Sequence, residues 1–306
     1  MEYDPADVCA QSVKGGMGPA SLPVIMVPVP RRGMLTLQLK SGNKMPVLGL
    51  GTWQLTGDEC TNSVIMALEL GYRHIDTAEG YGNHEQVRAG IEKSGVKREE
   101  LFITSKVSHS NLRRADVLAA CDKALKELRT DYLDLYLVHW PNSSIPMEET
   151  LGAMSELVDA GKVRDIGVSN FTISHMEEAA RVSPKPISVN QVEYHAYLNQ
   201  EDLLAKCNEL GVVLTAYSPL ARGELLNDAV LEGIAAAHGK TVAQIALRWL
   251  VQKGVVVIPK ARSRKHLSDN MNMFDFELTD EEMARIDAIE TTKRLINPPW
   301  AEFDRS

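Results

Sequence analysis

The chain has 306 residues, 44% of them hydrophobic, and a formal net charge of −8, which is the composition of an ordinary soluble globular protein. The acidic balance disfavours non-specific nucleic-acid binding, and no run of about 18 apolar residues is present for a membrane span. The four cysteines match no zinc spacing and no disulfide framework, so we expect reduced thiols, no metal and a cytoplasmic location. They are Cys9, Cys60, Cys121 and Cys207.

Residues 1–33 differ in composition from the rest of the chain. They include the stretch Gly15-Gly16-Met17-Gly18, and such a density of glycine and proline leaves neither helical nor strand periodicity. Five of the 14 prolines lie there: Pro5, Pro19, Pro23, Pro28 and Pro30. We therefore expect a disordered extension over 1–33, followed by a single domain over 34–306.

From residue 34 onward, strand-like and helix-like patterns alternate. Residues 35–39 and 45–48, joined by a turn at 41–44, predict an antiparallel hairpin. Eight strands are then expected at 47–51, 74–77, 101–106, 133–139, 163–169, 189–193, 212–217 and 255–259. Helices are expected through 64–70 and at 83–94, 115–128, 146–160, 173–181, 201–210 and 241–253, with helical pieces ending near 289 and an irregular stretch before 241.

Eight successive strand–helix units predict a closed barrel. Several strands, such as LDLYLV and VVVIP, are apolar at consecutive positions, as expected for a parallel sheet covered on both faces. An open doubly wound sheet would need a Gly-x-Gly-x-x-Gly turn, but the run from Gly49 and Gly51 places Gln54 at the third glycine position. The pattern therefore favours an α/β fold of the (β/α)₈ TIM-barrel class, with an N-terminal β-hairpin.

Polar residues follow the expected strands one after another. In this fold, active sites lie at the carboxyl ends of the strands. The residues found there are Asp76, Lys106, His139, Ser169, Asn170, Gln191, Glu193, Tyr217, Ser218 and Lys260. Any one of them alone is better explained by solvent, whereas such a series indicates a functional site.

Tyr81 lies between two glycines just beyond the second strand. A loop of this kind can direct the phenol into the mouth of the barrel. A nearby ammonium group such as Lys106, held in place by Asp76, would lower the pKa of the phenol and make it a better acid. The alternative is a surface tyrosine beside a buried Asp–Lys pair, and spacing alone leaves both interpretations open.

Eight sequence strings resemble the motifs of the aldo-keto reductases and occur in the family order. They are GLGTW, GYRHIDTAEGYGNHEQV, TSKV, DLYLVHWP, GVSNF, NQVEYH, YSPLARG and IPK. The resemblance implies a barrel that binds a nicotinamide cofactor without a Rossmann fold and reduces aldehydes or ketones to alcohols. The family's catalytic tetrad corresponds to Asp76, Tyr81, Lys106 and His139, with Tyr81 as general acid.

The resemblance also implies which residues bind the cofactor and the substrate. Ser169, Asn170 and Gln191 would bind the nicotinamide carboxamide, and Tyr217 would stack on the ring. The full cofactor set comprises Gly51, Thr52, Trp53, Asp76, Ser169, Asn170, Gln191, Tyr217, Ser218, Leu220, Gly223, Lys260, Ala261, Arg262, His266 and Asn270. The substrate pocket, open and suited to small or sugar-derived carbonyls, comprises Trp53, Tyr81, His139, Trp140 and Trp300.

The chain departs from the family pattern where the 2′-phosphate of NADPH would bind. A serine and an arginine of the family correspond here to Ala261 and His266, beside Lys260. Arg262, Arg264 and Lys265 lie nearby and could replace the missing cation. We therefore expect NADPH to be preferred and NADH to be used as well.

Two other classes of protein are compatible with parts of this pattern. A metal-dependent hydrolase or isomerase could use Asp76, His139, Glu193 and His195, although no His-x-His ends the first strand. A cofactor-sensing binding module on the same fold, like the potassium-channel β subunits, is the main alternative. The expected partner is a small carbonyl compound, and the expected state is a monomer or a weak homo-oligomer.

Overall fold

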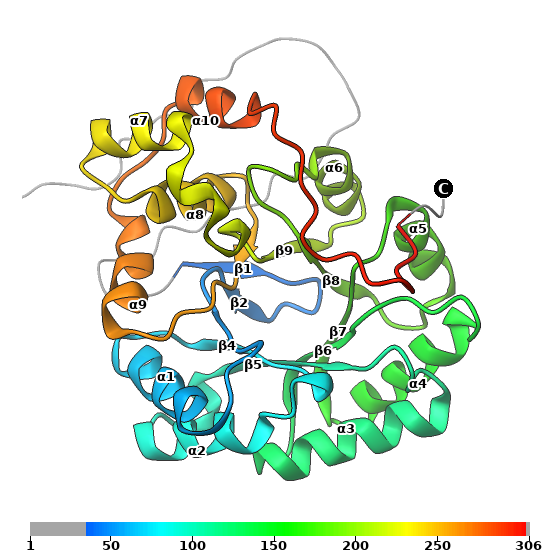
Figure 1. Ribbon diagram of the computed structural model, residues 1–306. Helices are drawn as coiled ribbons and strands as arrows, with labels where there is room; N and C mark the ends of the chain where they lie inside the picture. Colours follow the sequence, from blue (N-terminus) through cyan, green and yellow to red (C-terminus); the bar gives the residue numbers. More distant parts are fainter. Residues whose placement is uncertain (1–34, 304–306) are drawn as a thin grey trace, which may run out of the picture.

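The structure, a computed structural model, describes residues 35–303 and is a (β/α)₈ barrel (Figure 1). The extension predicted at 1–33 lies outside these residues. Neighbouring parallel strands of the barrel follow one another in chain order, which confirms the predicted fold class. The strands are β3 (Leu50–Gly51), β4 (His74–Asp76), β5 (Phe102–Val107), β6 (Leu133–Val138), β7 (Val163–Ser169), β8 (Ile187–Glu193), β9 (Val213–Tyr217) and β10 (Val256–Val257).

The barrel closes where the segment before β3 meets β10. Leu48 and Val257 form a parallel bridge, and the amide of Gly49 donates to the carbonyl of Val257 at 2.9 Å. At Gly51 the two segments approach so closely that a Cβ would lie 2.5 Å from the carbonyl oxygen of Ile258. Glycine is therefore required at the seam, directly beneath the mouth of the barrel.

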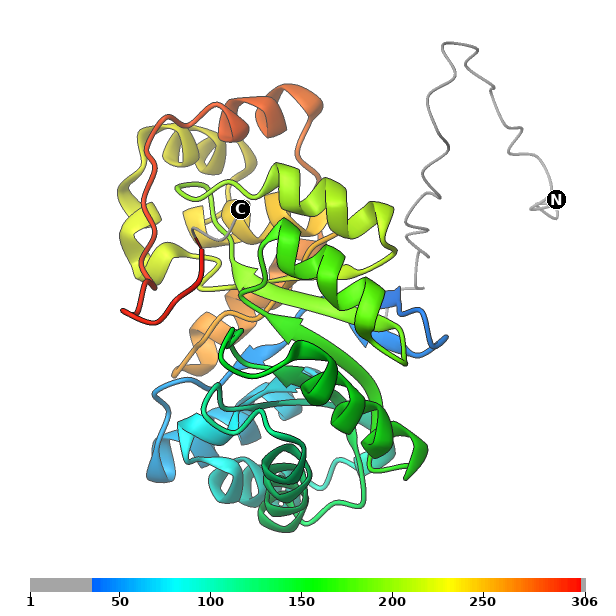
Figure 2. The same cartoon turned by 90° about the vertical axis from the view of Figure 1, so that its right-hand side faces the viewer.

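A β-hairpin, β1 (Thr36–Gln38) and β2 (Lys44–Pro46), covers the amino-terminal end of the barrel, opposite the C-terminal residues (Figure 2). Leu37 and Met45 are buried on its inner face. The carboxylate of Asp165 in β7 accepts hydrogen bonds from Ser41 at 2.9 Å and from Asn43 at 2.7 Å. The hairpin turn is thus fastened to the barrel at the end away from the strand carboxyl ends.

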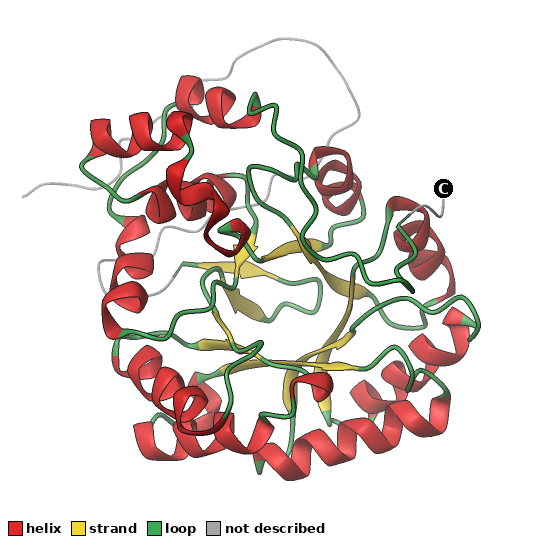
Figure 3. Cartoon of the chain, in the orientation of Figure 1, coloured by secondary structure: helices red, strands yellow, loops and turns green. Residues whose placement is uncertain are grey.

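Helices surround the strands on the outside, as Figure 3 shows. They are α1 (Gly57–Glu69), α2 (His84–Ser94), α3 (Arg114–Leu128), α4 (Met147–Asp159), α5 (Ile173–Val182), α6 (Glu201–Glu209), α7 (Ala229–His238), α8 (Val242–Gln252), α9 (Arg264–Met271) and α10 (Asp280–Asp287). Within the described residues 35–303, four 3₁₀ segments also occur: η1 (Glu79–Tyr81), η2 (Arg98–Glu100), η3 (Ala221–Asn227) and η4 (Asn272–Phe274).

Helix α7 lies in the stretch for which the sequence predicted irregular structure, so that prediction was wrong. The carboxylate of Asp228 caps its first turn by accepting from the amides of Val230 at 2.9 Å and Leu231 at 3.0 Å. Gly239 ends the helix with a φ of +61°. These two residues are ordinary helix start and stop signals that the alternating pattern around them obscured.

The register of β7 and β8 aligns residues at the mouth of the barrel. A register shift follows Ile166, and Gly167 is required there because a Cβ would lie 2.6 Å from the carbonyl oxygen of Val189. Beyond the shift, Ser169 is paired with Gln191. Two side chains from different strands therefore end at the same level and face the same space.

Three cysteines fall within the described residues, and all of them are buried free thiols. Burial raises the pKa of Cys60 to about 11 and the pKa of Cys121 and Cys207 to about 12. At neutral pH these side chains are uncharged components of the core. No helix within residues 35–303 is both long and apolar enough to cross a membrane.

Candidate active site

A cavity of about 790 Å³ lies at the carboxyl ends of the barrel strands, where active sites of this fold occur. Most of the residues that the sequence singled out line it. These are Gly51, Trp53, Asp76, Tyr81, His139, Trp140, Ser169, Asn170, Gln191, Tyr217, Ser218, Leu220, Gly223, Lys260 and Trp300. A volume of this size lies within the range of about 300–1,000 Å³ that is typical of small-molecule and cofactor sites.

Six predicted site residues do not line this cavity. Thr52 is buried and donates to the carbonyl oxygen of Asp76 at 2.9 Å, while Lys106 lies directly behind Asp76. Asn270 is also buried, in α9, where it hydrogen-bonds Tyr72. Ala261 is buried, whereas Arg262 and His266 are exposed.

Lys106 is fully buried in β5, and its ammonium group has three hydrogen-bond partners. Nζ donates to Oδ1 of Asp76 at 2.5 Å and to the carbonyl oxygen of Thr77 at 2.9 Å. The third partner is the phenol oxygen of Tyr81 at 3.4 Å. Because the Asp76–Lys106 pair is buried, the lysine charge is held in one position beside the phenol.

The 3₁₀ segment η1 positions Tyr81 at the edge of the cavity. It ends at Gly82, whose φ of +63° lies in the left-handed region that glycine adopts without strain. The carboxylate of Glu79 accepts a hydrogen bond from the amide of Ser108 at 2.9 Å. This contact fastens η1 to the loop after β5, the strand that contains Lys106.

The acid–base state of Tyr81 differs from the sequence-based expectation. Burial, together with the negative charge of Asp76, raises the pKa of Tyr81 well above its ordinary value. The expectation of a lowered pKa for Tyr81 is therefore wrong, because burial, the larger cause, and the negative charge of Asp76 both raise it. The phenol retains its proton at neutral pH and is available as a hydrogen-bond donor.

His139 follows β6 and lies against Tyr81, with ring centroids 5.6 Å apart in an edge-to-face arrangement. Burial lowers the pKa of His139 to about 3, and the positive charge of Lys106 contributes. The imidazole is therefore neutral at physiological pH. A neutral ring has one N–H donor and one acceptor, which suits it to orient a polar group in the cavity.

The side chains of Ser169, Asn170 and Tyr217 form a hydrogen-bonded network in the wall of the cavity, and Ser169 Oγ continues it by donating to the backbone carbonyl oxygen of Gln191 at 2.7 Å. Nδ2 of Asn170 donates to Ser169 Oγ at 3.1 Å, and the phenol of Tyr217 donates to Asn170 Oδ1 at 2.7 Å. Nε2 of Gln191 donates to Oδ2 of Asp76 at 2.7 Å. Gln191 thus connects this network to the carboxylate that holds Lys106.

Two cations, Arg222 in η3 and Lys260 in the loop after β10, lie beside Trp53 at the other end of the cavity. The guanidinium carbon of Arg222 is 4.6 Å from the centroid of the Trp53 ring, and Lys260 Nζ is 5.8 Å from it. Nζ of Lys260 donates to the amide oxygen of Gln54 at 3.1 Å. Partial burial, together with the positive charges of Arg262 and Arg222, lowers the pKa of Lys260. This concentration of positive charge favours an anion.

Sequence patterns do not single out Arg222, and they indicate Arg262, Arg264 and Lys265 instead. Each of those three has a carboxylate partner: Arg262 has Glu59 at 3.1 Å, Arg264 has Glu69 at 2.5 Å and Lys265 has Asp269 at 2.6 Å. Among the residues that the structure describes, Arg222 and Lys260 have none. Arg222 has a φ of +54°, an unusual conformation that local sequence patterns do not predict.

Residues 293–303, here called the C-terminal segment, cross the mouth of the barrel outside any helix or strand (Figure 1). Trp300 stacks on His109 from the loop after β5, with ring centroids 4.0 Å apart and an interplanar angle of 8°. It also meets Trp140 edge to face at 5.1 Å. This aromatic cluster closes one side of the cavity.

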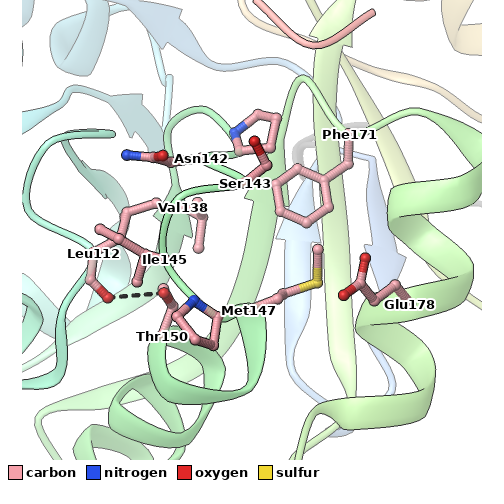
Figure 4. Close-up of a pocket in the computed structure, with 11 residues that line it drawn as sticks. Leu112, Val138, Asn142, Ser143, Ile145, Met147, Thr150, Phe171 and Glu178 are labelled. Carbon is pink, nitrogen blue, oxygen red and sulfur yellow. Dashed lines mark hydrogen bonds between the residues drawn. The ribbon is translucent and has the colours of Figure 1, made fainter. Parts of the chain in front are cut away.

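A second cavity, of about 80 Å³, lies between α4 and α5 (Figure 4). Met147, Thr150, Phe171 and Glu178 are among its lining residues, and Thr150 donates to the carbonyl oxygen of Leu112 at 2.8 Å. At about 30 Å³ per water molecule, it has room for two or three waters. It contains none of the predicted site residues.

Of the residues considered for a metal site, Asp76 and Glu193 already have hydrogen-bond partners and belong to two different pairs. Glu193 hydrogen-bonds His195 at 3.0 Å, and Asp76 is paired with Lys106. No group of three or more His, Cys, Asp or Glu side chains within 35–303 has an arrangement suitable for a metal ion.

The fold and the cavity define a barrel enzyme whose polar side chains converge at the carboxyl ends of the strands. A sequence model of the Aldo/keto reductase family matches residues 47–291. The chain therefore belongs to the aldo-keto reductase family and is an NAD(P)H-dependent oxidoreductase that acts on carbonyl compounds.

Three relatives illustrate the similarity. The chain is 46% identical to the glyoxal reductase of Bacillus subtilis over 261 residues, which cover 85% of this chain and 94% of that protein. It is 42% identical over 265 residues to a 9,11-endoperoxide prostaglandin H2 reductase of Trypanosoma cruzi, covering 85% and 93%. A crystal structure of a Bombyx mori aldo-keto reductase in complex with NADP superposes with a TM-score of 0.82, at 36% identity, covering 87% and 95%.

Proposed function

We propose that the protein reduces small aldehydes and ketones to alcohols with NADPH, and that Tyr81 is the general acid. The observation that supports this most directly is the buried Asp76–Lys106 pair, whose ammonium group lies 3.4 Å from the Tyr81 phenol at the edge of the large cavity. A protonated phenol facing a substrate space, with a fixed positive charge behind it, is suited to donate a proton.

Each of the four residues has a distinct part in this proposal. Tyr81 donates its proton to the carbonyl oxygen as that oxygen gains negative charge. Lys106 then stabilises the phenolate that remains, because its charge is already in place and requires no reorganisation. Asp76 holds the lysine, and neutral His139 hydrogen-bonds the carbonyl oxygen and fixes its direction.

The donor set of the cavity fits a nicotinamide dinucleotide. Ser169, Asn170 and Gln191 offer hydroxyl and amide groups for a carboxamide, and the ring of Tyr217 offers a face for stacking. Arg222 and Lys260 supply positive charge for the additional phosphate of NADPH at the other end. The bound cofactor would supply the hydride, while these residues hold it beside the proton donor.

The preference for NADPH over NADH is expected to be modest. Two charge-assisted contacts from Lys260 and Arg222 would favour the additional phosphate by about tenfold to a few hundredfold. Lys260→Ala and Arg222→Ala should each raise the KM for NADPH by about tenfold and leave the KM for NADH within about twofold. Steady-state kinetics with both cofactors measure this, and the preference should shrink with added salt.

Arg264→Ala is the matched control for these two variants. Its guanidinium is paired with Glu69 and lies outside the cavity wall, so the KM for NADPH should not change. Equal KM values for the two cofactors at low salt would contradict the assignment. If only Arg264→Ala raised the KM for NADPH, the phosphate site would instead be assigned to α9.

A substrate panel followed at 340 nm tests the proposed reaction. Glyoxal, methylglyoxal, benzaldehyde and an aldose would be supplied with NADPH, because small and sugar-derived carbonyls are the proposed substrates and a relative is a glyoxal reductase. Turnover of one or more of them supports reduction. Tight NADPH binding without any turnover would instead favour the cofactor-sensing module.

A further inference from the structure

Glu193, the last residue of β8, is a buried carboxylate with no part in the proposed chemistry. Its two oxygens accept three hydrogen bonds. Oε1 accepts from His195 Nε2 at 3.0 Å and from the backbone amide of Leu295 at 2.7 Å. Oε2 accepts from the backbone amide of Ile296 at 2.8 Å. Two of these donors belong to the C-terminal segment.

A fully buried carboxylate is stable in its charged form only when its oxygens have donors. Burial alone would raise the pKa of Glu193, but the hydrogen bonds from His195, Leu295 and Ile296 together hold it below its ordinary value. Glu193 is thus ionised at neutral pH. Its charge-assisted bonds join the end of a barrel strand to a segment that has no regular structure of its own.

The residues that Glu193 holds are continuous with the wall of the main cavity. Residues 295–298 and Trp300 all line the cavity. Beyond them, the carboxylate of Glu302 accepts from the amide of Ser143 at 2.7 Å. The wall is therefore fixed at both ends, and Glu193 provides the attachment nearest to the centre of the barrel.

We propose that Glu193 is a positioning residue that holds the C-terminal segment across the mouth and thereby sets the affinity for the carbonyl substrate. Through this segment it fixes Trp300 against His109 and Trp140. The effect on substrate affinity rests on the proposed function, since the wall influences turnover only where a carbonyl is reduced beneath it. The attachment itself does not depend on that function.

Limited trypsin digestion of the resting protein tests the attachment. Lys293 and Arg294 are trypsin sites immediately before the residues that Glu193 holds. Glu193→Gln replaces one acceptor oxygen with an NH₂ group facing a backbone N–H, so the segment should open more often. We expect cleavage at these sites to be at least about tenfold faster, measured by mass spectrometry of the released peptide.

Two further variants keep this test decisive. Asp165→Asn also alters a buried, hydrogen-bonded carboxylate, but at the hairpin end of the barrel, so cleavage at 293–294 should remain at the wild-type rate. Ile296→Pro removes one N–H donor from the segment without changing the barrel, and it should reproduce the faster cleavage even if Glu193→Gln folds poorly. Wild-type cleavage rates in both Glu193→Gln and Ile296→Pro would overturn the proposal.

Kinetics of Glu193→Gln distinguish a loss of positioning from general structural damage. Glu193→Gln should raise the KM for the aldehyde by about tenfold, with kcat and the Kd for NADPH within about twofold of wild type. In a Trp300→Ala background the same substitution should add less than about twofold, because both act on one wall. Fully additive effects would overturn the proposed route through the segment.

A failure of the proposed function can be distinguished from a failure of the positioning role of Glu193. A wild-type protein that turns over no aldehyde contradicts the reductase proposal, yet its trypsin cleavage still reports on Glu193. Conversely, active enzyme whose cleavage and KM are unaffected by Glu193→Gln contradicts the positioning role alone.

Discussion

Tyr81→Phe is expected to lower kcat for aldehyde reduction by about 10²–10⁴-fold, the usual effect of removing a general acid. The substitution removes one oxygen, the acceptor of the 3.4 Å hydrogen bond from Lys106, and keeps the ring that packs against His139. The Kd for NADPH and the Tm should therefore change little. Turnover at 340 nm and cofactor fluorescence titration measure the two effects separately.

Tyr197→Phe is the control for this prediction. Tyr197 likewise has a hydrogen-bonded phenol, which donates to the carboxylate of Asp228 at 2.9 Å, but it does not line the cavity. Its kcat should equal that of the wild type. A Tyr81→Phe enzyme that retained half of the wild-type kcat would show that the proton comes from elsewhere.

Asp76→Asn is expected to reduce both stability and activity. The variant leaves the ammonium group of Lys106 buried without its counter-charge, which costs about 3–5 kcal/mol in the free energy of unfolding. It should also lower kcat, because the lysine is no longer held charged beside Tyr81. Urea unfolding and turnover at 340 nm measure the two losses.

The stability loss of Asp76→Asn should depend on pH in a defined direction. Burial already lowers the pKa of Lys106, and Asp76 opposes that shift, so the substitution lowers the pKa further. Between this lowered pKa and the unfolded value of about 10.4, the unfolded chain binds more protons than the native state. The stability of the variant therefore rises with pH above this lowered pKa, and its deficit relative to the wild type should narrow with rising pH until the less strongly lowered pKa of wild-type Lys106 is reached.

The double variant Asp76→Asn with Lys106→Met separates charge from packing. It contains no unpaired buried charge, so it should regain much of the stability that Asp76→Asn loses. Its activity should stay low, because the positive charge behind Tyr81 is absent. A double variant as unstable as Asp76→Asn, or a deficit that does not change with pH, would contradict this account of the pair.

The fold and the location of the cavity were predictable because even the short strands of this chain have a recognisable pattern of apolar residues. The strand ends at Asp76, Lys106 and His139 can be recognised from apolar runs that end in polar residues, and the barrel topology then brings them together. In such a barrel each strand pairs with the strands that precede and follow it in the chain, so the strand order follows once the strands are recognised.

The remaining features depend on contacts that no local pattern reveals. Whether a cation is already paired decides its role: Arg262 and Arg264 follow Lys260 within four residues but have carboxylate partners, whereas Arg222 reaches Trp53 from η3. The raised pKa of Tyr81 likewise depends on burial and on the distribution of charge around Asp76, which spacing cannot provide.

The burial of the cysteines has a consequence for an enzyme that handles reactive carbonyl compounds. Aldehydes and dicarbonyls modify proteins at nucleophilic side chains, and for cysteine the nucleophile is the thiolate. Cys60, Cys121 and Cys207 lie in the core, and with pKa values of about 11 to 12 only about one thiol in 10⁴ or fewer is ionised at pH 7. Within residues 35–303, the thiols therefore present almost no target to the compounds that enter the cavity, and the catalyst is chemically inert toward its own electrophilic substrates at these positions.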